Sequence, residues 1–294
     1  MAIMRFNYRS QAMGGYLDIT VVYPTDGLSY YDMTKQTRHH LMPGWQPRPV
    51  YRPGMKFQTI YLIHGGGDDD SLTYRYTNAE RYANENNVML VTPDIMNSFG
   101  INTRYGVEYQ TFLTEELPVV IQSLFASSPR REDNFIVGYA MGGNVALGTA
   151  VRRPDLFAGC VDISGGIGMT MNTETLQQEM TEPHFRLYHT SFGEAEEIEG
   201  SEYDIRAAGA ASLASGAPQP KFWILSGEKE FVRDRIHADA VTMETMGYDV
   251  TYLELEGMDH NFDLWDRACR MAMEELLPLK RRPLYPEEDE YGTD

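Results

Sequence analysis

The sequence is poor in cysteine and in positive charge. Only two cysteines occur, Cys160 and Cys269, which is too few for a disulfide framework, and their spacing does not indicate a metal site. We interpret both as packed thiols. The formal net charge of −18 argues against nucleic acid or an anionic membrane as a partner, because both require a basic surface.

Long apolar runs are also missing. No stretch approaches the roughly 20 residues needed to cross a bilayer. The first residues lack the apolar core and the cleavage site of a signal peptide. We therefore expect a cytoplasmic protein without a membrane partner and leave open whether it forms a homo-oligomer.

Nothing in the sequence indicates a cofactor or a metal site. Asp68, Asp69 and Asp70 are three consecutive carboxylates that could suggest a metal site, but consecutive side chains point in different directions and no EF-hand spacing follows. We interpret them as a solvated loop and a helix cap.

Short apolar runs alternate with amphipathic stretches along most of the 294 residues. The runs predict strands at 16–24, 57–63, 88–92, 135–137, 158–164, 221–226 and 250–255. The stretches between them predict helices at 71–87, 109–125, 233–246 and 261–277. This alternation is typical of an α/β fold with a mostly parallel sheet, and the length suits one domain.

We predict a single domain over residues 1–280 and a mobile acidic tail over 281–294. Two segments depart from the alternation. Residues 25–56 combine proline and glycine with aromatic residues, which predicts an irregular loop that is either a surface connection or a wall of a pocket. Residues 167–220 are long enough for a cap-like insertion above the strand ends, where such folds bind ligands.

The most informative stretch is a glycine-bounded turn that joins a strand to a helix. Residues 138–142 read Gly-Tyr-Ala-Met-Gly, which is the G-x-S-x-G layout of a nucleophile elbow with Ala140 in place of the serine. Side chains at Gly138 and Gly142 would collide with the neighbouring helix and strand in such a turn. A glycine-rich turn in another kind of α/β protein is the alternative.

A second glycine-rich loop, His64-Gly65-Gly66-Gly67, follows the apolar strand at 57–63. Glycines after this strand allow the main chain to approach a substrate carbonyl and to donate a backbone N–H to its oxygen. A phosphate-binding loop would instead need a Lys-Ser/Thr pair or the G-x-G-x-x-G spacing.

Three strand ends carry, in chain order, Ala140, Glu230 and His260. This order matches nucleophile, acid and histidine, and the carboxyl ends of parallel strands share one edge of a sheet. His260 would act as general base, because an imidazole can accept a hydroxyl proton at neutral pH and return it to a leaving group. Glu230 would hold the imidazole in the correct tautomer.

Other residues of the right chemical type remain as alternatives. The acid could be Glu228, Asp234 or Asp259, which lie close in sequence to the preferred residues, and the insertion offers His184 and His189 as bases. We interpret Glu115 and Glu116, within the helix at 109–125, as a solvated face or a structural hydrogen bond.

Together these motifs resemble the esterase D and tributyrin-esterase group of the α/β-hydrolase superfamily, which includes acetyl-xylan and feruloyl esterases. The resemblance rests on the elbow at 137–143, the strand and loop at 62–66, the segments 154–157 and 163–165, the acid turn at 227–231 and the histidine turn at 257–265. It implies the α/β-hydrolase fold and oxyanion donors at the N–H groups of Gly66 and Met141. Glu230 departs from the usual aspartate, and Ala140 departs from the serine.

The resemblance implies a serine-type carboxylesterase that acts through an acyl-enzyme on small-molecule esters, with short-chain acyl or hydroxycinnamoyl groups on sugars or plant phenolics. Alanine removes the attacking oxygen, and triad knockouts lose on the order of a millionfold in turnover. Because the acid, the base and the glycine loops are intact, we interpret Ala140 as a replacement made to hold an ester uncleaved. The alternatives are a natural pseudoenzyme that binds without cutting, or a thioesterase or peptidase of the superfamily.

Overall fold

The computed structural model describes residues 2–24, 54–181 and 185–285. Most of the loop predicted at 25–56, His184 and the end of the acidic tail therefore lie outside the described residues. The first part of the predicted tail does pair with the domain, because Leu284 is buried and exchanges two backbone hydrogen bonds with Lys56.

Eight strands form one sheet in the order β1-β2-β4-β3-β5-β6-β7-β8. They are β1 (Ala2–Ser10), β2 (Gly15–Tyr23), β3 (Thr59–Ile63), β4 (Met89–Pro93), β5 (Asn134–Tyr139), β6 (Gly159–Ile163), β7 (Lys221–Gly227) and β8 (Val250–Leu255). β2 runs antiparallel to β1 and to β4. The other six strands, β4, β3, β5, β6, β7 and β8 in sheet order, are parallel to one another. The mostly parallel sheet predicted from the alternation is confirmed.

The sequence pattern did not predict β1. This strand lies at the edge of the sheet and most of its residues are exposed or half-buried. Arg5, Asn7 and Arg9 interrupt its apolar residues, so it lacks the apolar run of the inner strands. The inner strands β3, β4, β5 and β6 are buried along their whole length, which is why short apolar runs marked them clearly.

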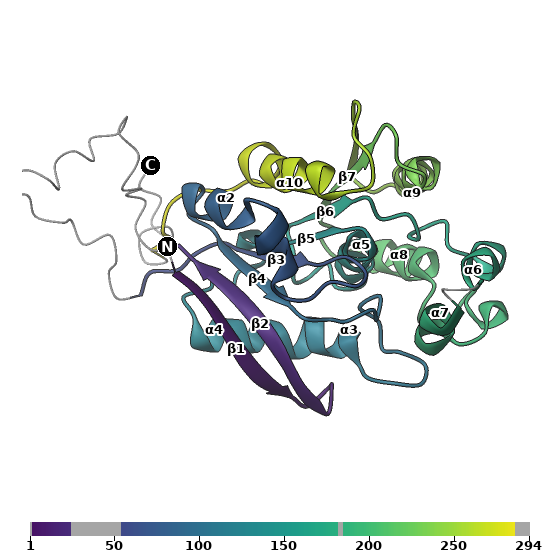
Figure 1. The fold of residues 1–294 in the computed structure, drawn as a ribbon, viewed down its shortest axis with the longest axis horizontal. Coiled ribbons are helices and arrows are strands. Elements are labelled where there is room, and N and C mark those ends of the chain that lie inside the picture. Colours follow the sequence, from purple (N-terminus) through teal and green to yellow (C-terminus); the bar gives the residue numbers. More distant parts are fainter. Residues whose placement is uncertain (1, 25–53, 182–184, 286–294) are drawn as a thin grey trace, which may run out of the picture.

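Helices cover both faces of the sheet (Figure 1). They are α1 (Leu72–Tyr76), α2 (Ala79–Glu85), α3 (Tyr109–Thr111), α4 (Leu117–Leu124), α5 (Met141–Arg152), α6 (Thr173–Glu179), α7 (Phe185–Phe192), α8 (Ile205–Ala214), α9 (Arg233–Met246) and α10 (Phe262–Met271). α2 and α10 contribute to one apolar cluster, and α4, α5 and α9 contribute to the other. The sheet therefore separates two cores.

Two predicted helices are interrupted. The stretch at 71–87 divides into α1 and α2, because Thr77 is extended at the end of α1 and Asn78 begins α2. The stretch at 109–125 contains a π-helical segment, Phe112–Glu116, between α3 and α4. Glu116 in this segment accepts hydrogen bonds from the Tyr8 hydroxyl at 2.9 Å and from the Gln11 N–H at 2.8 Å, so it fixes the β1–β2 hairpin.

The segment at 167–220 holds α6, α7 and α8 and contains no strand among its described residues. Figure 1 shows α6 and α7 together at the end of the molecule opposite the N-terminus. In the described part of the chain, no helix is long and apolar enough to span a membrane. Those residues also include no group of three or more side chains that could hold a metal ion.

Candidate active site

Ala140 occupies a strained turn between β5 and α5. Its backbone angles are φ 52° and ψ −123°, and its N–H donates to the Ile163 carbonyl at 2.9 Å. A residue with a side chain adopts such a conformation at a cost of about 1–3 kcal/mol, and the surrounding structure must enforce it. The backbone at residue 140 is therefore held in the form that presents a nucleophile.

The two flanking glycines leave no space for a side chain. A Cβ atom at Gly138 would lie 2.0 Å from the Gly142 carbonyl oxygen, and one at Gly142 would lie 2.2 Å from the Ile63 carbonyl oxygen. Both obstacles are backbone atoms, so they cannot move aside as a flexible side chain can. The collisions anticipated from the sequence are present in the structure.

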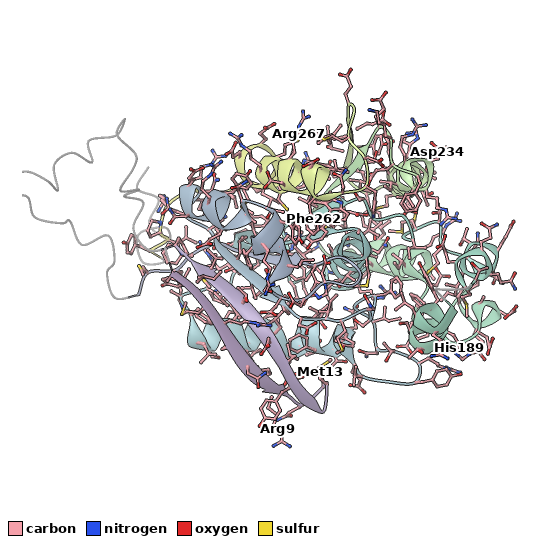
Figure 2. The ribbon with its side chains drawn as sticks, in the orientation of Figure 1. Arg9, Met13, His189, Asp234, Phe262 and Arg267 are labelled. Atoms are coloured by element: carbon pink, nitrogen blue, oxygen red, sulfur yellow. The ribbon has the colours of Figure 1, made fainter. Side chains whose placement is uncertain are left out.

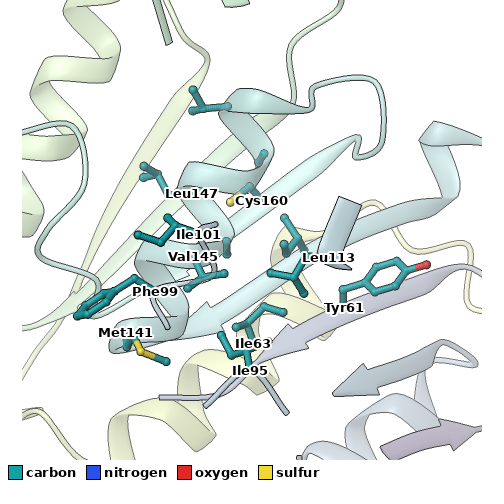
Figure 3. Packing of buried hydrophobic residues seen from close by; sticks show 14 of the residues in the cluster. Tyr61, Ile63, Ile95, Phe99, Ile101, Leu113, Met141, Val145, Leu147 and Cys160 are labelled. Carbon is teal, nitrogen blue, oxygen red and sulfur yellow. The ribbon is translucent and has the colours of Figure 1, made fainter. Parts of the chain in front are cut away.

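The elbow rests on a rigid apolar layer. Figure 3 shows Met141 and Val145 of α5 packed near Ile63, Ile95 and Phe99, which come from β3 and from the loop after β4. This packing fixes the N-terminus of α5 beside the end of β3. The free N–H groups at a helix N-terminus carry a partial positive charge, which favours a developing oxyanion.

Gly66 lies next to this helix N-terminus. A Cβ built on Gly66 would be 3.9 Å from the Met141 Cβ. The structure therefore brings together the two residues whose N–H groups were predicted to form the oxyanion hole.

His64 holds the loop that contains Gly66. It is fully buried, its Nε2 accepts from the Ile95 N–H at 3.0 Å, and its Nδ1 lies 2.8 Å from the Gly65 carbonyl oxygen. Because Nε2 accepts, the proton is on Nδ1 and the ring is neutral. His64 thus ties the glycine loop at 65–67 to the loop after β4. We did not assign this role from the sequence, although a histidine directly before the glycines was a usable signal.

The carboxylates of the predicted solvated loop have separate structural roles. Asp68 accepts from the Tyr139 hydroxyl at 3.0 Å, and burial raises its pKa. Asp69 accepts from two N–H groups at the start of α1, and Asp70 is buried and pairs with Arg5 at 2.6 Å. Asp70 is therefore an internal anchor for β1, which differs from the solvated interpretation.

Glu230 and His260 form a hydrogen-bonded pair. Glu230 Oε1 lies 2.8 Å from His260 Nδ1, and Glu230 Oε2 accepts from the Gly227 N–H at 2.7 Å. The Glu230 side chain has no exposed surface, whereas 23% of the His260 side chain is exposed. A carboxylate that is fixed at both oxygens orients the imidazole and leaves Nε2 for proton transfer.

The alternative acids have other partners. Glu228 accepts from the Gly257 N–H at 2.7 Å, and the Asp234 carboxylate pairs with Arg233 at 2.9 Å. Asp259 accepts from the backbone N–H of His260 at 2.8 Å, so it touches the main chain of the histidine and not its ring.

His189 is far from this pair. Figure 2 shows it on α7, well separated from Phe262 at the start of α10. It pairs with Glu194 at 3.1 Å and stacks on Tyr105. It does not border the pocket described next, whereas Phe262 does.

Aromatic rings surround the imidazole. Phe231 and Trp265 each make an edge-to-face contact with His260, with ring centroids 5.2 Å apart. The Trp265 Nε1–H donates to Ser164 Oγ at 3.1 Å. Ser164 has a positive φ of 60°, directly after β6. Trp265 therefore fixes the ring of His260 and depends on Ser164 for its own orientation.

A pocket of about 480 Å³ opens above these strand ends. Gly66, Ala140, Met141 and His260 all border it. Its remaining walls are mainly apolar or backbone, and they include Phe99, Ile167, Leu187, Tyr188, Phe231, Val232, Phe262 and Trp265. A pocket of this size and lining suits a small organic ligand.

Buried side chains hold the segment 164–170, of which residues 164–167 border the pocket and form its floor. Asp162 Oδ1 accepts from the Gly165 N–H at 3.0 Å, and Asn144 Oδ1 accepts from the Ile167 N–H at 2.9 Å. Asp239 accepts from the Gly168 N–H at 2.9 Å. Burial, with the nearby charge of Asp239, raises the pKa of Asp162 to about 8, and burial raises the pKa of Asp239 to about 6.

Known proteins match this chain over most of its length. The family model named Esterase, described as "Putative esterase", matches residues 45–265. An acetyl esterase from Caldicellulosiruptor saccharolyticus is 26% identical over 248 residues, which cover 77% of this chain and 89% of that protein.

Solved structures share the fold. FphF, a fluorophosphonate-binding serine hydrolase of Staphylococcus aureus solved with substrate bound, has a TM-score of 0.77 at 24% identity, covering 94% of this chain and 98% of FphF. A ferulic acid esterase has a TM-score of 0.69 at 14% identity, covering 95% of this chain and 98% of the other. The predicted α/β-hydrolase fold is confirmed.

Proposed function

Because this chain belongs to the Esterase family and resembles an acetyl esterase over most of its length, we propose that residue 140 is the nucleophile position of a serine-type carboxylesterase site. In the serine form, the hydroxyl would attack an ester carbonyl while His260 removes its proton. The N–H groups of Gly66 and Met141 would stabilise the oxyanion, and Glu230 would orient and stabilise the charged imidazole.

The observation that carries this proposal is the pairing of two features in one pocket. Ala140 has the backbone angles of an elbow, although alanine gains nothing from that strain. His260, on the same pocket, is bonded through Nδ1 to a buried carboxylate. A site that bound ligands without catalysis would need neither a strained turn nor an oriented imidazole.

The chain as it stands has no hydroxyl at position 140. We propose that it binds esters and does not form an acyl-enzyme, as expected of a replacement that traps ligand uncleaved. A natural pseudoenzyme would also bind without cutting, but a pseudoenzyme whose site has drifted would remain inactive when the hydroxyl is restored.

We propose short-chain acyl or hydroxycinnamoyl esters as substrates. The support is the similarity to an acetyl esterase in sequence and to a ferulic acid esterase in fold. The aromatic walls at Phe99, Tyr188 and Phe231 offer flat apolar surfaces that suit an aryl group.

The test is a substrate panel on the Ala140→Ser variant, with Ala140→Ser/His260→Gln as the matched control that keeps the hydroxyl and loses the base. The panel contains 4-nitrophenyl acetate, 4-nitrophenyl butyrate, methyl ferulate, a thioester and a peptide. Hydrolysis of the oxygen esters by the single variant, and loss of that activity in the control, is the expected result. A folded Ala140→Ser variant that cleaves none of them contradicts the proposal, and a preference for the thioester or the peptide reassigns the reaction.

A further inference from the structure

The pocket carries an ion pair that the acyl-transfer chemistry does not use. Glu179 Oε1 accepts from Arg235 Nη1, and the Tyr188 hydroxyl donates to Glu179 Oε2 at 3.5 Å. Glu179 and Tyr188 belong to α6 and α7 of the insertion, whereas Arg235 belongs to α9. All three border the same pocket as Ala140 and His260.

Helix stability does not explain these two charges. Glu179 is the last residue of α6, where the partial negative charge of the helix end disfavours a carboxylate. Arg235 lies in the first turn of α9, where the partial positive charge disfavours a guanidinium. The pair is also partly solvated, with 36% of the Arg235 side chain and 26% of the Glu179 side chain exposed, and such pairs contribute little to folding.

The contacts define what a ligand must supply. Both oxygens of Glu179 already have a hydrogen-bond partner. The Arg235 guanidinium has five N–H donors, and among the described residues only Nη1 donates to an acceptor. The unused groups are therefore N–H donors, which call for an oxygen acceptor. Because Glu179 neutralises Arg235, and the whole chain carries a net charge of −18, a neutral acceptor is favoured over an anion.

A hydroxyl group meets both conditions, since it is neutral and its oxygen can accept from Arg235. A Glu179 oxygen has a second lone pair and can also accept the hydroxyl proton. We propose that Glu179, Tyr188 and Arg235 form a subsite for a neutral, hydroxylated part of the bound ester. This specificity rests on the proposed function. The subsite selects hydroxylated esters over alkyl esters and over esters that carry a carboxylate.

The test measures binding to the chain with Ala140 in place, so that no turnover is needed. Three acetate esters of six-membered rings are titrated by protein-observed NMR: a methyl mono-O-acetyl-xyloside, cyclohexyl acetate and 4-acetoxycyclohexanecarboxylate. We expect the xyloside to bind roughly tenfold more tightly than either of the other two esters, because its hydroxyl groups can form hydrogen bonds with the charged side chains of the subsite.

The same titrations on Glu179→Gln/Arg235→Met should reduce this preference toward unity. Arg235→Lys, which keeps the charge but loses the forked donors, should give an intermediate preference. The matched control is Arg270→Met/Glu274→Gln, which removes an ion pair between α10 and the π-helical segment that follows it, Ala272–Leu276. Neither residue borders the pocket, so this variant should keep the full preference. Near-UV circular dichroism verifies that each variant is folded.

Three results overturn the subsite: no binding of the xyloside, a preference for the carboxylate ester, or an unchanged preference in the Glu179→Gln/Arg235→Met variant. These results are separate from the catalytic proposal. An Ala140→Ser variant that fails to hydrolyse esters refutes the proposed reaction, while the binding preference of the Ala140 chain still decides the subsite.

Discussion

The buried carboxyl of Asp162 gives the protein a stability that depends on pH. It lies under the pocket floor, where its Oδ1 accepts from the Gly165 N–H, and burial and the nearby Asp239 raise its pKa to about 8. An ordinary aspartate titrates near 3.9, so the native state holds this proton more tightly than the unfolded chain does. The free energy of unfolding therefore decreases as the pH rises from about 4 through about 8.

The magnitude follows from linkage. One extra proton bound by the native state changes the free energy of unfolding by about 1.4 kcal/mol per pH unit. Between pH 6 and pH 8 the contribution of Asp162 should fall by about 2 kcal/mol, once its partial titration near pH 8 is included. Asp239 has a pKa of about 6, so most of its own contribution to the free energy of unfolding is already lost at pH 6, where this interval begins.

The Asp162→Asn substitution tests this reasoning, because the amide keeps an oxygen acceptor for Gly165 and does not titrate. Urea unfolding followed by tryptophan fluorescence at pH 6 and pH 8 gives the two free energies for each protein. We expect the decrease of about 2 kcal/mol in the unsubstituted chain to disappear in the variant.

The matched control is Asp249→Asn, which changes a side chain that is 70% exposed and should leave the decrease intact. An equal decrease in Asp162→Asn and in the unsubstituted chain would refute the raised pKa.

Three further outcomes are expected. Gly142→Ala should destabilise the fold by about 1–3 kcal/mol or more, because the methyl group would collide with two backbone carbonyl oxygens. Gly66→Ala should change the melting temperature little, because the nearest atom to its methyl group would be 3.6 Å away. Ala140→Gly should raise the melting temperature, because glycine adopts the positive φ without strain. The free energy of unfolding should rise by about 1 kcal/mol, once the greater flexibility of glycine in the unfolded chain is subtracted, and an unchanged or lower melting temperature argues against strain at this turn. In the Ala140→Ser background, Glu230→Gln should lower kcat by on the order of 10⁴, and Glu228→Gln should not; the reverse would identify Glu228 as the acid.

The sequence predicted best the strands of the parallel part of the sheet. β5 and β7 are buried over nearly their whole length, and the half-buried edge strand β8 is rich in β-branched and aromatic residues, so the ends that carry Ala140, Glu230 and His260 could be located and ordered without coordinates. The glycines at 138 and 142 were informative for the same reason, since backbone atoms occupy the space that a side chain would need.

Contacts between distant segments could not be predicted. Three interactions join residues from separate elements: the hydrogen bond from the Ile95 N–H to His64, the proximity of Asp162 and Asp239 under the pocket floor, and the Glu179–Arg235 ion pair. No periodicity relates such partners, because tertiary packing alone sets their distance. For the same reason, the sequence could not predict that Asp70 is buried and paired with Arg5.

The most direct test of the central claim, that residue 140 is the nucleophile position, is covalent labelling of Ala140→Ser with an organophosphonate, read by intact-protein mass and peptide mapping. The introduced hydroxyl should be labelled stoichiometrically at position 140, and Ala140→Ser/His260→Gln should be labelled far more slowly, because the base is missing. The chain with Ala140 should take up no label. A folded Ala140→Ser variant that remains unlabelled, or that is labelled at another residue, would contradict the account.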